Sequence, residues 1–158
     1  MALVILAPVM LVVLFLIWRQ DFKNPLYVSK RVGRNQKIFG MLKFRTMIYD
    51  AEKSGVFSTS DSDKRITALG HFLRRTKLDE TPQLINVVFG QMSFVGPRAN
   101  VISEVEFYSE EEKRLLSVRP GITDFSSIVF ADEGSILAGS QNPDGDYRRL
   151  IWPGKSIL

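Results

Sequence analysis

The sequence predicts an α+β fold: a small compact domain with a short β-hairpin and several amphipathic helices, anchored by an N-terminal membrane helix. Residues 2–17 contain no polar side chain, so this segment can enter a bilayer. Two extended runs flank the turn-forming residues 33–36, which indicates a β-hairpin. Later segments carry apolar residues at helical spacing. At 158 residues the chain fits one modest domain, and we expect residues 1–18 to form the membrane helix and residues 19–158 the attached domain.

Composition excludes several kinds of site. The chain has no cysteine and one histidine, His71, which excludes disulfides, thiol nucleophiles and metal sites built from several cysteines or histidines. The net charge of +4 favours an acidic partner, such as a phosphate, an anionic membrane or a nucleic acid. Composition alone does not choose among these partners.

The N-terminal apolar segment ends at Trp18 and Arg19. A straight membrane span needs roughly 20 apolar residues, and Pro8 removes a helical hydrogen bond near the middle of this segment. We therefore expect a Pro-broken, re-entrant helix, with a buried helix of a soluble protein as the alternative. Six cations and one acid lie between Arg19 and Lys37. The positive-inside rule then places the domain at the cytoplasmic face, close to anionic membrane lipids.

The predicted hairpin runs from Leu26 to Met47, with its turn at residues 33–36. Side chains alternate along the second strand, which places Lys43 and Arg45 on the same face. Two cations on one strand face can bind a phosphate or a carboxylate. The alternative is a solvated strand edge.

Two helices are expected after the polar loop at residues 49–64. The first covers residues 65–75 and is amphipathic, with its apolar positions at Ile66, Leu69, Phe72 and Leu73. The second begins at Thr81-Pro82, because threonine can cap a helix and proline suits its first position. It is expected to stop at Gly90 and to bury Leu84, Ile85, Val87 and Val88.

Two adjacent carboxylates, Asp79 and Glu80, lie between these helices, after the cations Arg74, Arg75 and Lys77. Ionised carboxylates are favoured at a helix N-terminus, and the cations can attract a phosphorylated ligand. The same pattern also fits a simple helix cap beside solvated surface cations. The local sequence leaves both interpretations open.

The last third of the chain contains three further signals. A Gly96-Pro97 break ends a short apolar run and places Arg98 on a loop. Ser109 and Glu112 form a capping box that opens a charged helix. Residues 121–130 have extended character, and the remainder has no clear periodicity.

Four motifs, in this order, resemble the bacterial sugar transferase family, the monotopic phosphoglycosyl transferases. The resemblance extends from the helix that contains Pro8 to about Tyr147. The motifs are Lys43-Phe44-Arg45-Thr46-Met47, Leu73-Arg74-Arg75 with Leu78-Asp79-Glu80-Thr81-Pro82-Gln83-Leu84, Val95-Gly96-Pro97-Arg98, and Arg119-Pro120-Gly121-Ile122-Thr123.

The resemblance implies a membrane enzyme at the cytoplasmic face of a bacterial inner membrane. Such an enzyme moves a phosphosugar from a nucleotide sugar, usually a UDP-sugar, to polyprenol phosphate and releases UMP. It implies that Asp79 is the nucleophile and forms a covalent phosphosugar intermediate, which a carboxylate can do at phosphorus. Glu80 would assist through metal binding or proton handling, with Mg²⁺ held near both carboxylates to offset the charge of the substrate.

The candidate substrate-binding residues lie within the matched motifs. Arg98 is expected on a phosphate, and Lys43 or Arg45 in a pair with the acids of the site. The full set is Lys43, Arg45, Arg74, Arg75, Gln83, Pro97 and Arg98. Three features depart from the family pattern: Ala99 follows Arg98 where relatives commonly have proline, Ala7 precedes Pro8 where they often have serine, and the chain is expected to be truncated at its ends.

Two other functions compete with the transferase. One is a non-enzymatic, membrane-anchored regulatory or scaffold module of the same fold. The other is a membrane-anchored nucleic-acid binder, which is disfavoured because the cations are not interleaved with an exposed aromatic platform. We therefore expect no nucleic-acid partner. The sequence does not identify the sugar, the glycan pathway or the oligomeric state.

Overall fold

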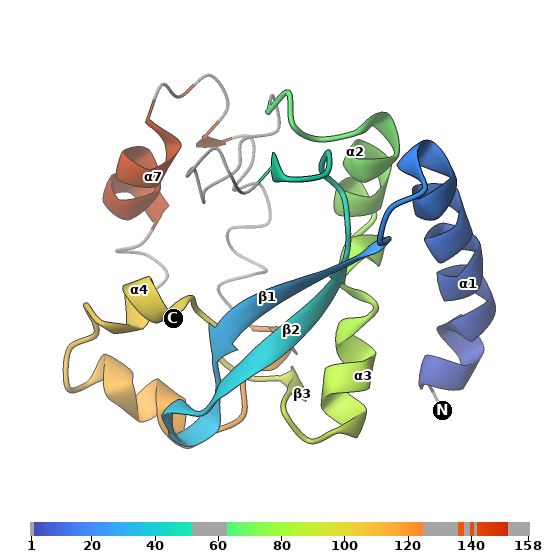
Figure 1. Cartoon of the computed structure of the whole chain (residues 1–158). Helices are drawn as coiled ribbons and strands as arrows, with labels where there is room; N and C mark the ends of the chain where they lie inside the picture. Colours follow the sequence, from blue (N-terminus) through green and yellow to red (C-terminus); the bar gives the residue numbers. More distant parts are fainter. Residues whose placement is uncertain (1, 52–62, 125–135, 138–139, 141, 152–158) are drawn as a thin grey trace.

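The computed structural model describes residues 2–51, 63–124, 136–137, 140 and 142–151, and the statements below refer to these residues. Helices α1, α2 and α3 lie together beside a two-stranded hairpin, and α4 and α7 lie towards its other side (Figure 1). This arrangement confirms the predicted mixture of helices with a hairpin and an apolar N-terminal helix.

The hairpin consists of β1 (Leu26–Val32) and β2 (Ile38–Phe44), paired antiparallel from Leu26 opposite Phe44 to Val32 opposite Ile38. Its turn contains the short 3₁₀ helix η1 (Arg34–Gln36), in which Asn35 has a φ of 55°. Asparagine tolerates this left-handed conformation better than most residues. The predicted hairpin and its turn are therefore confirmed.

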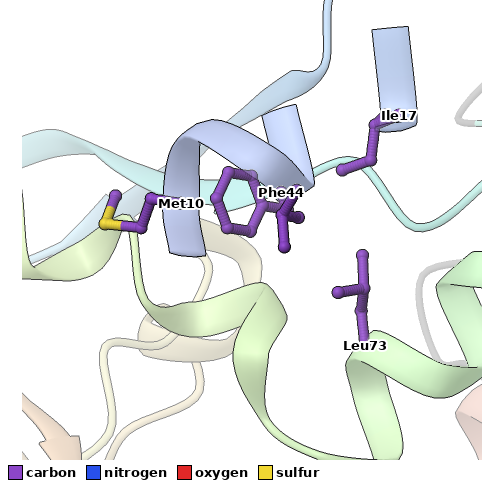
Figure 2. Packing of buried hydrophobic residues seen from close by; sticks show 5 residues of the cluster. Met10, Ile17, Phe44 and Leu73 are labelled. Carbon is purple, nitrogen blue, oxygen red and sulfur yellow. The ribbon is translucent and has the colours of Figure 1, made fainter. Parts of the chain in front are cut away.

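Helix α1 (Ala2–Asp21) runs without interruption past Pro8. Figure 2 shows Met10 and Ile17 of this helix beside Phe44 of β2 and Leu73 of α2. The rest of α1 exposes apolar side chains, including Val4, Ile5 and Leu11. By length and composition, α1 can cross a membrane, with a mean hydropathy of 2.3 from Leu3 to Asp21. The re-entrant geometry stays a prediction.

Helix α2 (Ala68–Arg75) is shorter than the predicted helix because Thr67 caps it, accepting a hydrogen bond from the Gly70 N–H at 3.0 Å. The placement of Phe72 on the buried face was wrong, since Phe72 is 48% exposed. The buried residues of α2 are Gly70 and Leu73, and an added Cβ at Gly70 would lie 2.0 Å from the Thr46 carbonyl oxygen. Gly70 and Leu73 therefore define a narrow contact face.

The 3₁₀ turn η3 (Leu78–Glu80) leads directly into helix α3 (Gln83–Val88). The sequence predicted Thr81 as the helix cap, and this prediction was wrong. The Thr81 backbone is already helical, and its hydroxyl donates to the Leu78 carbonyl at 2.8 Å. Leu84 is buried, but Val88 is 69% exposed, so its predicted burial was wrong. Gly90 has a φ of 70° and ends the helix as predicted.

The segments after α3 pair two of the sequence motifs with each other. Strands β3 (Ser93–Val95) and β4 (Gly121–Thr123) are parallel, and a cross-strand bridge joins Arg98 to Gly121. The contact is so close that a Cβ on Gly121 would lie 2.3 Å from the Gly96 nitrogen. The two motifs are thus packing partners.

The remaining elements are short: α4 (Ile102–Val105), η4 (Glu112–Ser117), α7 (Pro143–Asp146) and the π-helical turn η5 (Tyr147–Ile151). The predicted capping box is confirmed, because the Ser109 N–H donates to Glu112 Oε2 at 2.8 Å and the Glu112 N–H donates to Ser109 Oγ at 3.2 Å. It opens a 3₁₀ helix. Most of the predicted extended segment at residues 121–130 lies outside the described residues.

Candidate active site

The two carboxylates are placed by a tight turn between α2 and α3. Helix α2 ends at Thr76, whose hydroxyl donates to the Phe72 carbonyl at 2.9 Å. Lys77 then adopts a left-handed conformation with a φ of 56°, which is uncommon for a residue other than glycine. This reversal directs η3 towards β2, so that Asp79 and Glu80 lie near the end of the hairpin.

Glu80 forms an ion pair with a cation from the hairpin. Lys43, on β2, donates from Nζ to Glu80 Oε1 at 2.6 Å, and the two side chains are 20% and 25% exposed. The sequence left open whether Lys43 or Arg45 would pair with an acid of the candidate site, and in the structure Lys43 does. Among the described residues, Asp79 forms no comparable ion pair.

The electrostatic environments of the two carboxylates differ. Burial raises the pKa of Asp79 above its usual value, against the opposing charges of Lys43 and Arg74. Burial also acts to raise the pKa of Glu80, but the charge and hydrogen bond of Lys43 outweigh it and hold this pKa below its usual value. Burial lowers the pKa of the Lys43 ammonium, while Glu80 opposes that shift. The pKa values of the two carboxylates are therefore shifted in opposite directions from their ordinary values.

Further cations surround the pair. Arg98 is exposed on the loop after β3, and its charge acts to lower the pKa of Glu80. Arg74, on α2, donates from Nε to Thr46 Oγ1 at 2.9 Å, and its charge reaches Asp79. The structure thus brings Lys43, Arg74 and Arg98 together with both carboxylates.

Four other candidate substrate-binding residues lie differently. Arg45 contacts Asp21 at the end of α1, Arg75 is exposed on α2, and Gln83 is 2% exposed within the fold. Pro97 is partly buried, and its carbonyl accepts a hydrogen bond from the Gly121 N–H at 3.0 Å. Their contacts with a substrate stay predictions, and for Gln83 burial disfavours direct contact.

Sequence reasoning missed Asn86, which ties α3 to β2. Its side chain accepts from the Leu42 N–H at 3.0 Å and donates to the Gly40 carbonyl at 2.8 Å and to Gln91 Oε1 at 2.6 Å. The available signal was a single amide within the apolar run Leu84 to Val88. A buried amide requires partners, and here they fix the helix that follows the carboxylates against the strand that carries Lys43.

The two carboxylates form a donor set that suits Mg²⁺. Across the described residues, no group of three or more histidine, cysteine or acidic side chains could hold a metal ion. Mg²⁺ commonly binds through one or two carboxylates, with water and substrate phosphates as its other ligands. Asp79 and Glu80 therefore fit a Mg²⁺ ion that reaches the site with a phosphorylated substrate.

A family model described as bacterial sugar transferase matches residues 1–149. The chain belongs to the bacterial sugar transferase family. The predicted family is confirmed.

Curated proteins similar to this bacterial sugar transferase have related names. An uncharacterized sugar transferase of Haemophilus influenzae is 41% identical over 138 residues, which cover 78% of this chain and 29% of that protein. The undecaprenyl-phosphate galactose phosphotransferase of Salmonella typhimurium is 36% identical, with the same two coverages. A Bacillus subtilis protein, named putative undecaprenyl-phosphate N-acetylgalactosaminyl 1-phosphate transferase, is 44% identical over 96 residues, 61% of this chain and 54% of that one. This sugar transferase chain thus spans less than a third of the first two relatives.

Proposed function

We propose that the protein transfers a phosphosugar from a nucleotide sugar, of the UDP class, to polyprenol phosphate at the cytoplasmic face of a membrane. The observation that carries the proposal is the difference between the environments of two adjacent carboxylates. Lys43 balances the charge of Glu80, while the pKa of Asp79 is raised and Asp79 has no ion pair among the described residues. Buried carboxylates whose pKa values are perturbed by desolvation and by a specific charge partner are typical of functional sites. Similarity to a protein named UDP-galactose-lipid carrier transferase in Erwinia amylovora supports the donor and acceptor classes.

In the first step, a carboxylate oxygen of Asp79 attacks the phosphorus that carries the sugar. The bond from that phosphorus to the bridging oxygen breaks, and its electron pair leaves with UMP. The raised pKa of Asp79 favours it as the nucleophile, because a more basic carboxylate attacks phosphorus more readily. Lys43, Arg74 and Arg98 offset the repulsion between this carboxylate and the anionic donor.

In the second step, a phosphate oxygen of the acceptor attacks the same phosphorus. The bond between phosphorus and Asp79 breaks, which restores the carboxylate and yields a polyprenyl diphosphosugar. Mg²⁺ bound by Asp79 and Glu80 would supply positive charge for the phosphates in both steps. The Lys43 ion pair keeps Glu80 ionised and oriented, so that this carboxylate does not compete with Asp79 as the nucleophile.

The test uses the full chain in detergent micelles with undecaprenol phosphate, Mg²⁺ and a panel of nucleotide sugars. We expect UMP release with at least one UDP-sugar, and labelled phosphosugar attached to wild-type protein when the acceptor is omitted. Asp79→Asn should lose both signals, while Glu110→Gln, an exposed carboxylate far along the chain, should keep them. Normal turnover by Asp79→Asn would exclude the proposed nucleophile. Absence of UMP with every nucleotide sugar would favour the non-enzymatic module.

A further inference from the structure

Arg45 joins the end of helix α1 to the hairpin. Its guanidinium donates two hydrogen bonds to Asp21, both at 2.6 Å, and a third from Nε to the Asn24 carbonyl at 2.9 Å. Its backbone N–H donates to the Pro25 carbonyl at 2.8 Å. The Arg45 side chain is only 11% exposed. The Asp21 side chain is 31% exposed. A bidentate pair has fixed geometry as well as charge.

In the described part of the chain, no residue of α1 beyond Ile17 belongs to the buried apolar cluster. The buried stripe of the helix ends at Ile17, and beyond it lies a cavity of about 240 Å³. The Asp21 and Arg45 pair connects helix and core beside that cavity. Residues from both sides line it, namely Ile17, Gln20 and Asp21 of α1 and Met47, Tyr49 and Thr67 of the core.

The helix exit is built to a defined geometry. Phe22 follows α1 with a φ of 57°, and its N–H donates to the Trp18 carbonyl at 2.7 Å. The two rings meet edge to face at 5.0 Å, the contact that accompanies a left-handed helix end. Lys23 then lies over the Tyr49 ring at 4.1 Å. The exit turn and the ion pair together set the direction of α1 relative to the core.

The same strand segment connects this joint to the active site. Lys43 holds Glu80, Phe44 is 2% exposed between α1 and α2, and Arg45 holds Asp21. A change in the direction of α1 would therefore move the core relative to any membrane in which α1 lies.

We propose that the Arg45 and Asp21 pair is a positioning device that sets the orientation of α1 so that a lipid-borne acceptor reaches Asp79. This inference rests on the proposed function. The donor is a soluble molecule and reaches the site at any orientation of the membrane helix, whereas the acceptor phosphate is fixed at the bilayer surface. Loss of the pair should thus impair the second step of transfer and spare the first.

The test compares the two steps in the full chain, reconstituted in vesicles of phosphatidylethanolamine and phosphatidylglycerol. Exchange of labelled UMP into UDP-sugar without acceptor reports the first step, and transfer to undecaprenol phosphate in the vesicles reports the second. Asp21→Asn should keep wild-type exchange and lose roughly tenfold to a hundredfold in transfer, the range expected from misplaced reactants. Lys113→Gln, which breaks an exposed ion pair with Glu110, is the matched control and should change neither.

A conservative variant separates positioning from general damage to the fold. Asp21→Glu keeps the carboxylate and should retain more transfer than Asp21→Asn, with wild-type exchange in both variants. Equal transfer by Asp21→Glu and Asp21→Asn would mean that the charged pair does not set the orientation of α1 and would overturn the inference. Equal loss of both steps in Asp21→Asn, or no loss of transfer, would also overturn it. Failure of wild-type exchange would count against the proposed function.

If wild-type exchange fails, a distance measurement that needs no enzymatic activity still tests the inference. The chain has no cysteine, so spin labels can be attached at Leu11→Cys on the exposed face of α1 and at Glu110→Cys on the core. We expect one narrow distance distribution in otherwise wild-type protein and a broader one with Asp21→Asn. Identical distributions would overturn the positioning role of the pair.

Discussion

Lys43 and Arg45, two positions apart in the chain, form ion pairs with the same shortest distance of 2.6 Å in two different regions. The partner of Lys43 is Glu80, which adjoins a second carboxylate and several cations. The partner of Arg45 is Asp21, which ends an apolar helix beside a cavity. The surroundings of the acid, rather than the ion pair itself, therefore distinguish the candidate active site from the contact between α1 and the hairpin.

The two regions also differ in what holds them. Behind the active site, the buried amide of Asn86 ties α3 to β2 through two hydrogen bonds. At the joint, the stripe of Met10, Val13 and Ile17 packs against Phe44 without directional bonds. Directional bonds suit a site that must hold reacting groups in register. Apolar packing needs an added directional contact to fix an angle, and the Arg45 pair supplies it.

The largest expected effect is on the Lys43 side of the comparison. Lys43→Gln leaves Glu80 partly buried without its counter-charge, so we expect both steps of transfer to fall by roughly two to three orders of magnitude, about 3–4 kcal/mol. Asp21→Asn should impair the second step alone. Lys43→Arg keeps the charge and should retain more activity than Lys43→Gln. If Lys43→Gln and Asp21→Asn reduced the rate of exchange equally, the two ion pairs would not differ in their roles.

The same variant predicts a shift in the pH dependence of exchange. In the wild type, Lys43 lowers the pKa of Glu80, so this carboxylate stays ionised as pH falls below its usual pKa of 4.5. The charge of Lys43 also acts to lower the pKa of Asp79, so without Lys43 both carboxylates take up protons at a higher pH. The acidic limb of the exchange profile should therefore move to higher pH in Lys43→Gln and stay in place in Asp21→Asn. A profile unchanged by Lys43→Gln would mean that ionisation of these two carboxylates does not limit exchange.

Much of the local structure was predictable because its determinants are close in sequence. The hairpin turn at residues 33–36, the helix end at Gly90 and the capping box of Ser109 and Glu112 each depend on residues a few positions apart. The cap at Thr81 failed because η3 already supplies helical backbone before α3. The predicted burial of Phe72 was wrong. The buried residues of α2 are Gly70 and Leu73, and Gly70 lies close to the Thr46 carbonyl.

The sequence indicated candidate residues for the site but not which of them form ion pairs. The sequence placed Lys43 and Arg45 on one strand face and left open which of them would meet the acids of the site. Their partners lie 37 and 24 positions away, so the fold decides the choice. The parallel pairing of β3 with β4 depends on a similar long-range contact. Local alternation does not contain that information.

Asn86→Ala should have the next largest effect, on stability rather than on chemistry. It leaves the Leu42 N–H and the Gly40 carbonyl without their partner, which costs about 2–3 kcal/mol in free energy of unfolding. Gln91→Ala removes one of the three bonds of Asn86 and should cost less. Denaturant unfolding in detergent micelles measures both. Equal costs would mean that the bonds of Asn86 to β2 contribute little.

Gly121→Ala tests the close backbone contact behind Arg98. The added Cβ would overlap the Gly96 nitrogen at 2.3 Å, so β3 and β4 must separate, at a cost of about 1–3 kcal/mol. On the helix side, Met10→Leu conserves volume within the apolar stripe and should cost less than about 1.5 kcal/mol. Thermal melting compares the two. If Met10→Leu lowered the melting temperature more than Gly121→Ala, close backbone packing would not be more important for stability near the active site than apolar packing is at α1.

The smallest expected effect concerns two left-handed residues, Lys77 before the carboxylates and Phe22 after α1. Lys77→Gly relieves backbone strain of about 1–2 kcal/mol, partly offset by the entropy of glycine, so we expect a gain of roughly 0.5 kcal/mol. Phe22→Gly relieves similar strain but loses the ring contact with Trp18, worth about 0.5–1.5 kcal/mol, and should gain nothing. Phe22→Ala loses the ring contact and keeps the strain, so it should be the least stable of the three. If Phe22→Gly melts as high as Lys77→Gly, the aromatic contact does not hold the helix exit, and its direction depends on the Arg45 pair alone.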